Sequence, residues 1–315
     1  MMVTIREYES QGHFSRVWKR LFEKKLALVC IFLILVIYLV GILAPYIAPY
    51  GYNEQDYTAI REAPSLDHLV GTDLKGRDVL SRVIWGIQNT VIITVISILT
   101  GSIAIGVSLG LIAGYYGGKV DSIIMRIGEL FASFPDILLV ILLAATLRPR
   151  ILDFVRWLED NTSLDGLVRS GIADYLVISL ALVSFSWVGM ARLVRGQVLV
   201  IKQLEYVDAA RASGAGIIRT VFLHVLPNVI SPVVVTVSMG MGSLIGTEII
   251  LSWLGLGIQP PGASWGNMVS SNMDKWRAYP LLVAIPGVVL AVAVFGFNFL
   301  GDGINDAINP RQIKR

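Results

Sequence analysis

The feature that most constrains this chain is a series of six long apolar segments. A helix needs roughly 20 apolar residues to cross the hydrocarbon core of a bilayer. The segments that meet this length lie at about 26–48, 89–114, 122–147, 172–195, 228–250 and 279–301. Charged residues make up 16% of the chain, whereas a soluble protein carries about 25%. The sequence therefore predicts an all-α polytopic membrane protein with six transmembrane helices.

The first apolar segment indicates the orientation of the chain. Residues 1–25 contain several Lys and Arg and no apolar run. The segment after them is longer than the apolar core of a cleaved signal peptide, so we predict an uncleaved first span with a cytoplasmic N-terminus. The segments then predicted to be external are 49–88, 148–171 and 252–278. Lys and Arg are more numerous on the cytoplasmic side, as the positive-inside rule requires.

This topology predicts the organisation of the whole chain. A cytoplasmic N-terminal segment (1–25) precedes the first transmembrane helix (26–48) and an external loop (49–88). Residues 89–301 form a five-helix core that contains a cytoplasmic loop at 196–227. The predicted cytoplasmic tail is 302–315. Cys30, the only cysteine, lies in the first span, which excludes an intramolecular disulfide and a cysteine-based metal site.

The third segment, 122–147, is the least regular of the six. Its first half carries Arg126 and Glu129, and Pro135 interrupts it. Residues three apart lie on one face of a helix, so Arg126 and Glu129 can pair. Charges at membrane depth usually face a bundle interior or water. We interpret this pair as structural, near the cytoplasmic interface, in preference to a substrate site.

The segment 205–228, EYVDAARASGAGIIRTVFLHVLPN, is short and mostly polar and lies between two apolar segments. Ala209 and Ala210 favour a helix, and Gly214 interrupts it. Apolar residues then resume before Leu226 and Pro227. The pattern predicts a helix, a kink and a second helix at the membrane surface, a shape suited to a groove on another protein. An ordinary amphipathic connector is the alternative.

Four stretches of the chain, in the same order, resemble one protein family. The segment 205–228 resembles the EAA loop of the membrane subunits of bacterial ABC importers. The stretches GTDLKGRDVLSRVIWG (71–86), LGLGIQPPGASWGNMV (254–269) and NFLGDGINDAINPR (298–311) resemble the C-type permease subunit of dipeptide/oligopeptide/nickel importers. Two residues of the loop depart from the general family pattern, namely Asp208 in place of Glu and His224 in place of Ile.

This resemblance implies the type I permease fold of ABC importers and a transport subunit rather than an enzyme. Such a subunit forms half of a pathway for di- or oligopeptides in a prokaryotic plasma membrane. The implied partners are a second homologous permease subunit, two ATPase subunits and an external substrate-binding protein, with no nucleic acid. ATP and Mg²⁺ then belong to the ATPase subunits, and this chain needs no cofactor or metal. Nickel complexes and oligosaccharides are the alternative cargoes.

The EAA-like loop contains the residues that the resemblance assigns to coupling with the ATPase. They are Glu205, Asp208, Ala209, Ala210, Gly214, Leu226 and Pro227. Asp208 is also favourable at the start of a helix, near the positive end of its dipole. His224 is interpreted as a packing or capping residue, because no His, Cys or paired carboxylate lies near it in sequence.

Two external stretches are candidates for a gate or for a contact with the binding protein. Their candidate residues are Asp73, Arg77, Asp78, Pro260 and Trp265. The alternative for 71–86 is an amphipathic helix lying on the membrane. The stretch 254–269 is expected to form an irregular hairpin, which is tolerated where protein or water covers it.

Small residues and one acidic residue within the spans leave two questions open. Gly106, Gly110 and Gly114 repeat every four residues and allow another helix to approach closely. That helix belongs either to this subunit or to a partner permease. Glu248, late in the fifth segment, either lines the pathway or caps a helix end.

Motifs argue against three other functions. The nearest match to a phosphate loop, AGYYGGKV (113–120), lacks the first Gly and the Ser or Thr of G-x-x-x-x-G-K-[ST]. Its Lys119 is interpreted as a lysine of the inner interface. An ion-coupled secondary transporter predicts inverted repeats with broken helices, and the sequence shows no such repeat. A membrane-embedded hydrolase is disfavoured because the three histidines are scattered and no catalytic motif is present.

Overall fold

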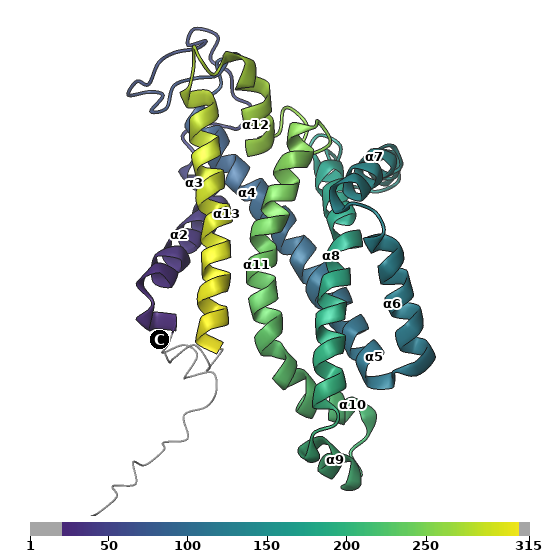
Figure 1. Cartoon of the computed structure of the whole chain (residues 1–315). Helices are drawn as coiled ribbons and strands as arrows, with labels where there is room; N and C mark the ends of the chain where they lie inside the picture. Colours follow the sequence, from purple (N-terminus) through teal and green to yellow (C-terminus); the bar gives the residue numbers. More distant parts are fainter. Residues whose placement is uncertain (1–20, 309–315) are drawn as a thin grey trace, which may run out of the picture.

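Helices make up the regular structure of residues 21–308, the range that this computed structural model describes (Figure 1). The first half contains α2 (Lys25–Ile42), α3 (Ala44–Ile47), α4 (Val79–Ser97), the π-helical η1 (Ile98–Val107), α5 (Ser108–Tyr116), α6 (Gly118–Ala132) and α7 (Asp136–Asn161). The second half contains α8 (Ile172–Ile201), α9 (Glu205–Ala212), α10 (Ile217–Thr220), the π-helical η2 (Val221–Val225), α11 (Leu226–Trp253), α12 (Trp265–Asn272), the 3-10 turn η3 (Met273–Lys275) and α13 (Leu281–Ile308).

Within residues 21–308, five helical units are long and apolar enough to cross a membrane. They are α2, the continuous unit α4–η1–α5, α8, the unit α10–η2–α11, and α13. A sixth unit consists of α6 and α7, which meet at an angle of 87°. Pro135 stands between them, and proline both lacks an N–H group and disfavours a helical residue before it. The prediction of an all-helical chain with six spans is confirmed when this bent pair is taken as one span.

Several helices extend further than the sequence indicates. The α4 helix begins at Val79, so the end of the predicted external loop 49–88 is helical. The α7 helix continues through Pro149 to Asn161, into the predicted external segment 148–171. Its Ile151 and Val155 are buried, while Asp153 between them is exposed.

The central helix of the bundle is α8, which packs against α4, η1, α5, α7 and α11. The largest buried cluster surrounds its first half, where Val177, Ile178 and Leu182 are almost fully buried. A second cluster surrounds its last turns, at Val194, Val198 and Ile201. Burial of apolar side chains at both ends makes α8 the element that connects the two ends of the molecule.

The glycine stripe of η1 and α5 lies against α8 of the same subunit. A Cβ atom added at Gly110 would lie 2.6 Å from Cβ of Val194, and one at Gly106 would lie 2.8 Å from Cβ of Met190. At Gly114 the corresponding distance is 2.6 Å, to Cβ of Val198. Of the two alternatives left open by the sequence, the structure shows the packing within the subunit.

The two ends of the described chain lie at the same end of the bundle. Lys24, just before α2, forms an ion pair with Asp306 in the last turns of α13. Ala27 and Ala307 are buried beside it in a small apolar cluster. We call this end, which also contains α9 and α10, the α9 end, and the opposite end the α12 end (Figure 1). Residues 1–20 and 309–315, which include most of the predicted terminal segments, lie outside the described range.

We expect Gly110→Val to lower the free energy of unfolding of the subunit by about 3 kcal/mol. The three side-chain carbons of valine cannot fit against Val194 unless α8 moves. The measurement is the apparent melting temperature of the purified protein, followed by fluorescence-detected size-exclusion chromatography. Gly196→Val is the matched control, since a Cβ atom at Gly196 in α8 would meet nothing within 4 Å. Equal melting temperatures for the two variants would contradict the assignment of this close contact.

Candidate functional site

The EAA-like loop folds as a helix, a tight turn and a second helix, as predicted. The α9 helix carries Glu205 and Asp208 in its first turn, where acidic side chains stabilise the positive end of the helix dipole. The helix ends at Ala212, and the turn after it contains Gly214, whose φ of 83° lies in the left-handed region that favours glycine. The N–H of Gly214 donates to the carbonyl of Arg211, and that of Ala215 to the carbonyl of Ala210. The sequence therefore sets both the length of α9 and the direction in which α10 leaves it.

A few contacts hold α9 against the ends of the long helices. Val207 is fully buried and packs with Val221 and Val225 of η2 and with the last turns of α8. The guanidinium of Arg211 lies 5.3 Å from the centroid of the Tyr115 ring, a cation–π contact with α5. Lys202, just after α8, donates to the carbonyl of Gly114 at 2.7 Å. The position of α9 is thus tied to both α8 and α5.

The predicted coupling residues fall into two groups in the structure. Glu205, Asp208, Ala209 and Gly214 are exposed on the part that projects beyond the long helices (Figure 1). Ala210 is half-buried between this surface and the bundle. Leu226 and Pro227 lie instead in the first turn of α11. Leu226 packs against the buried cluster that contains Val207. The projecting surface therefore comes from α9 and its turn, and Leu226 supports it from behind.

One ion pair at the α9 end was not predicted from the sequence. Arg195 of α8 makes a two-pronged contact with Asp121 at the start of α6, with Nη2 of Arg195 2.6 Å from Oδ2 of Asp121. Paired donors of this kind fix geometry as well as contributing energy. The two residues are far apart in the chain, so no local spacing could indicate the pair. By contrast, Arg126 and Glu129 pair as predicted, at 3.8 Å, and both are exposed.

At the α12 end, residues 71–78 form a buried turn rather than an amphipathic helix. Asp73 accepts hydrogen bonds from the backbone N–H groups of Lys75 and Arg77 and pairs with the guanidinium of Arg77 at 2.6 Å. Asp78 caps α4 by accepting from the N–H of Ser81 at 2.7 Å, and Nδ1 of His68 lies 3.1 Å from its other oxygen. Capping by Asp78 explains why α4 begins so early.

The loop before this turn is joined to it by backbone contacts. The N–H of Asp56 donates to the carbonyl of Gly76, and the N–H of Thr72 donates to the carbonyl of Glu62. The side-chain hydroxyl and the N–H of Thr58 both donate to the carboxylate of Asp56, and these bonds hold the pKa of Asp56 below its usual value. Residues 56–76 therefore form an ordered loop that precedes α4.

The external candidates also divide into buried and accessible residues. Trp265 is 1% exposed, and its indole N–H donates to the carbonyl of Val83 at 3.1 Å. Asp78 is 3% exposed, so the side chains of Trp265 and Asp78 lie too deep for direct contact with a partner. Asp73, Arg77 and Pro260 line one cavity of about 220 Å³, and Pro260 is exposed. The expected irregular hairpin is present between α11 and α12.

Glu248 is fully buried in the last turns of α11. Its Oε1 atom accepts hydrogen bonds from the hydroxyls of Ser252, at 2.7 Å, and Ser264, at 3.2 Å. Ser264 directly precedes α12, so Glu248 joins α11 to the irregular hairpin. In the sequence-based interpretations Glu248 lined the pathway or capped a helix end; in the structure it bonds to Ser264, the residue at the N-cap position of α12.

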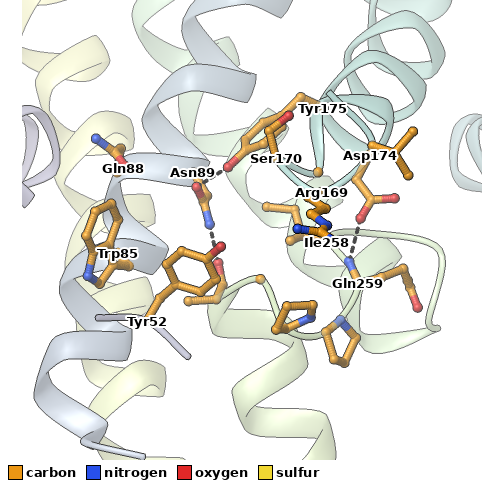
Figure 2. A pocket seen from close by; sticks show the side chains of 16 residues that line it. Tyr52, Trp85, Gln88, Asn89, Arg169, Ser170, Asp174, Tyr175, Ile258 and Gln259 are labelled. Atoms are coloured by element: carbon orange, nitrogen blue, oxygen red, sulfur yellow. Dashed lines mark hydrogen bonds between the residues drawn. The ribbon is translucent and has the colours of Figure 1, made fainter. Parts of the chain in front are cut away.

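A polar cavity of about 300 Å³ lies beside this hairpin (Figure 2). Its walls come from the start of α4, the linker and first turn of α8, and residues 258–263. Asn89 accepts a hydrogen bond from the Tyr175 hydroxyl and donates to the carbonyl of Ala263, which fixes one wall. Asp174 accepts from the N–H of Gln259 at 2.9 Å and fixes the other. No single stretch of sequence contains enough of this lining to have indicated it.

Within residues 21–308, no group of three or more His, Cys, Asp or Glu side chains is arranged to hold a metal ion. At the α12 end, the carboxylates of Asp73, Asp78 and Asp174 instead accept hydrogen bonds from backbone N–H groups.

Comparison with known proteins places this architecture in a known family. Residues 106–314 match the family described as the binding-protein-dependent transport system inner membrane component, and the chain belongs to it. Residues 13–64 match the N-terminal transmembrane domain of oligopeptide transport permease C. The chain is thus a multi-pass permease subunit of an ABC importer and not an enzyme, since ATP hydrolysis in this family takes place in separate subunits. The family requires no cofactor of its own.

Several individual relatives are similar over nearly their whole length. The glutathione transport system permease protein GsiD of Pectobacterium atrosepticum is 36% identical, with 98% of this chain and 94% of the relative covered. The dipeptide transport system permease protein DppC of Bacillus subtilis is 36% identical, with coverage of 96% and 87%. The oligopeptide transport system permease protein OppC of Bacillus subtilis is also 36% identical, with coverage of 95% and 91%.

We expect Asp78→Ala to lower stability by about 1–2 kcal/mol, because it removes the cap of α4 and leaves His68 without its partner. The apparent melting temperature of the purified protein measures this effect. Asp78→Asn should retain most of the stability, since asparagine also caps helices. Asp67→Ala is the control, because Asp67 is exposed in the same loop. A wild-type melting temperature for Asp78→Ala would show that the cap is unimportant.

Proposed function

We propose that this chain forms half of the translocation pathway of a peptide importer. The observation that carries the proposal is the similarity to GsiD, DppC and OppC over nearly the full chain. These relatives are named for the transport of glutathione, dipeptides and oligopeptides. A permease half must be completed by another subunit, so the partner is a second homologous permease. The cargo class proposed for this chain is accordingly di- or oligopeptides.

The remaining partners are two ATPase subunits and an external substrate-binding protein, with ATP and Mg²⁺ bound by the ATPases. The exposed residues of α9, namely Glu205, Asp208 and Ala209, form the contact with the ATPase together with Gly214. Their small or acidic side chains suit insertion into a fitted groove. At the opposite end, Pro260 is the exposed candidate for contact with the binding protein, because Arg77 is largely buried beside Asp73.

Transport proceeds by alternating access, driven through the α9 contact. When ATP closes the two ATPases, the docked loops approach each other and the spans reopen outward. Such coupling requires the loop to bind differently in the two states. The buried Val207 and the contact of Arg211 with the Tyr115 ring support this proposal, because they join α9 to α8 and α5. A displacement of α9 would therefore move the long helices.

The proposed location is the prokaryotic plasma membrane, with both termini and the α9 end in the cytoplasm. The distribution of Lys and Arg along the sequence supports this orientation. So does the ion pair between Lys24 and Asp306, which brings the two ends of the described chain to one side of the bundle. The loop 49–78 and the α12 region are external in this arrangement.

We expect Gly214→Leu to reduce both ATPase copurification and peptide uptake, while insertion into the membrane stays normal. A leucine there adds bulk to the contact surface and strains a backbone with positive φ. Gly166→Leu is the matched control, because Gly166 also has a positive φ (82°) and no atom within 4 Å of an added Cβ, but lies at the opposite end. Equal behaviour of the two variants would mean that α9 does not dock on the ATPase.

The orientation is tested with single cysteines in a Cys30→Ala background. Cysteines at Asn53, Asn161 and Asp274 should react with an impermeant thiol reagent added outside intact cells, and one at Gln203 should not. All four positions are exposed, so differences in labelling report the side of the membrane. Labelling at 203 together with protection at the other three positions would reverse the orientation and exclude a cytoplasmic ATPase at α9.

A further inference from the structure

The cavity at the α12 end presents two charged side chains, and one of them is already neutralised. Asp174, in the first turn of α8, forms an ion pair with Nη1 of Arg148 at 2.9 Å. The N–H of Gln259 donates to its other oxygen at 2.9 Å. The carboxylate of Asp174 is therefore occupied by groups of the wall, and its negative charge is balanced by Arg148.

The second charged side chain, Arg169, keeps its donors free. Within residues 21–308 its guanidinium makes no hydrogen bond and no ion pair, although it lines the cavity between Ser170 and Gln259 (Figure 2). Glu159 interacts with its charge through space, but the oxygens of Glu159 accept the N–H groups of Gly166 and Val168. These two bonds order the linker that carries Arg169. The cavity is thus lined by an exposed arginine whose guanidinium donors are free and which lies on an ordered segment.

The rest of the lining suits a small organic ligand rather than a bare ion. Tyr52, Trp85 and Tyr175 supply aromatic surface, and Gln88 supplies an amide that can both donate and accept. Aromatic walls with a few convergent polar groups are typical of sites for small ligands. The volume of about 300 Å³ lies at the lower limit of such sites, so it admits one end of a peptide or a molecule of similar size.

We propose that this cavity binds the carboxylate-bearing end of a peptide, with Arg169 as the group that recognises the carboxylate. The planar guanidinium matches a carboxylate with two parallel hydrogen bonds. The aromatic rings then contact the adjoining residue of the ligand. This inference rests on the proposed function, which supplies peptides as the cargo class. It adds a specificity site to the permease itself, distinct from the binding protein.

The test uses the purified complex with a reporter cysteine, Ser170→Cys in a Cys30→Ala background. The measured quantity is the rate at which N-ethylmaleimide alkylates the introduced thiol in the presence of trialanine, N-acetyl-trialanine or trialanine amide. The two peptides with a free carboxylate should slow alkylation, and the amide should not. The acetylated peptide separates recognition of the carboxylate from recognition of the amino group.

Substitutions of Arg169 in the reporter background make the assignment specific. Arg169→Gln should raise the half-protecting concentration of trialanine at least about tenfold, because a charged hydrogen-bond partner is lost. Arg169→Lys should raise it less, since lysine keeps the charge but not the paired donors. Arg150→Gln is the matched control, because Arg150 is exposed on α7 and does not line the cavity.

Uptake of trialanine by the reconstituted importer, measured in parallel, distinguishes the two proposals. Protection without uptake supports the cavity and overturns the function as a peptide importer. Uptake without protection overturns the cavity assignment and leaves the importer in place. Equal protection by trialanine and its amide, or unchanged protection in Arg169→Gln, also overturns the assignment to Arg169.

Discussion

The close contact between the glycine stripe and α8 is the interaction on which the rest of the structure depends. Three glycines in η1 and α5 allow α8 to approach so closely that each added Cβ would collide with a side chain of α8. In a bilayer, helix association relies on such packing, because lipid tails are as apolar as the helices themselves. The stripe therefore holds α8 at the centre of the bundle, with α7 and α11 packed around it.

The position of α8 has consequences at both ends of the molecule. Its first turn carries Asp174 and Tyr175, which fix two walls of the polar cavity. Its last turns pack on Val207, which anchors the projecting α9. One continuous helix thus connects the proposed docking surface for the ATPase with the cavity at the α12 end. Packed side chains and continuous helices of this kind are among the structures that carry energetic coupling between distant sites.

At the α12 end, polar contacts stabilise the irregular segments in addition to the apolar packing of α4, α12 and α13. Asp73 accepts hydrogen bonds from the turn that follows it, Asp78 accepts one from the first turn of α4, and Glu248 accepts one from Ser264 at the end of the hairpin. Buried polar groups are costly unless they are paired in this way. Because the pairing is extensive, the irregular segments 56–78 and 254–264 are ordered, and they can form the walls of a cavity beside the long helices.

The sequence by itself determined the helical class, the six crossings and the helix–turn–helix loop. The length of an apolar run and the backbone freedom of Gly214 are local properties, so they can be recognised without the tertiary structure. The motifs likewise indicated the family. Only the tertiary structure decided that the glycine stripe faces α8, that Trp265 and Asp78 are buried, and that α7 continues to Asn161. It also brought Arg148 to Asp174 and Asp121 to Arg195. These outcomes depend on contacts between helices and loops that are far apart in the sequence. The spacing of residues within one segment does not show which other segment that segment will contact.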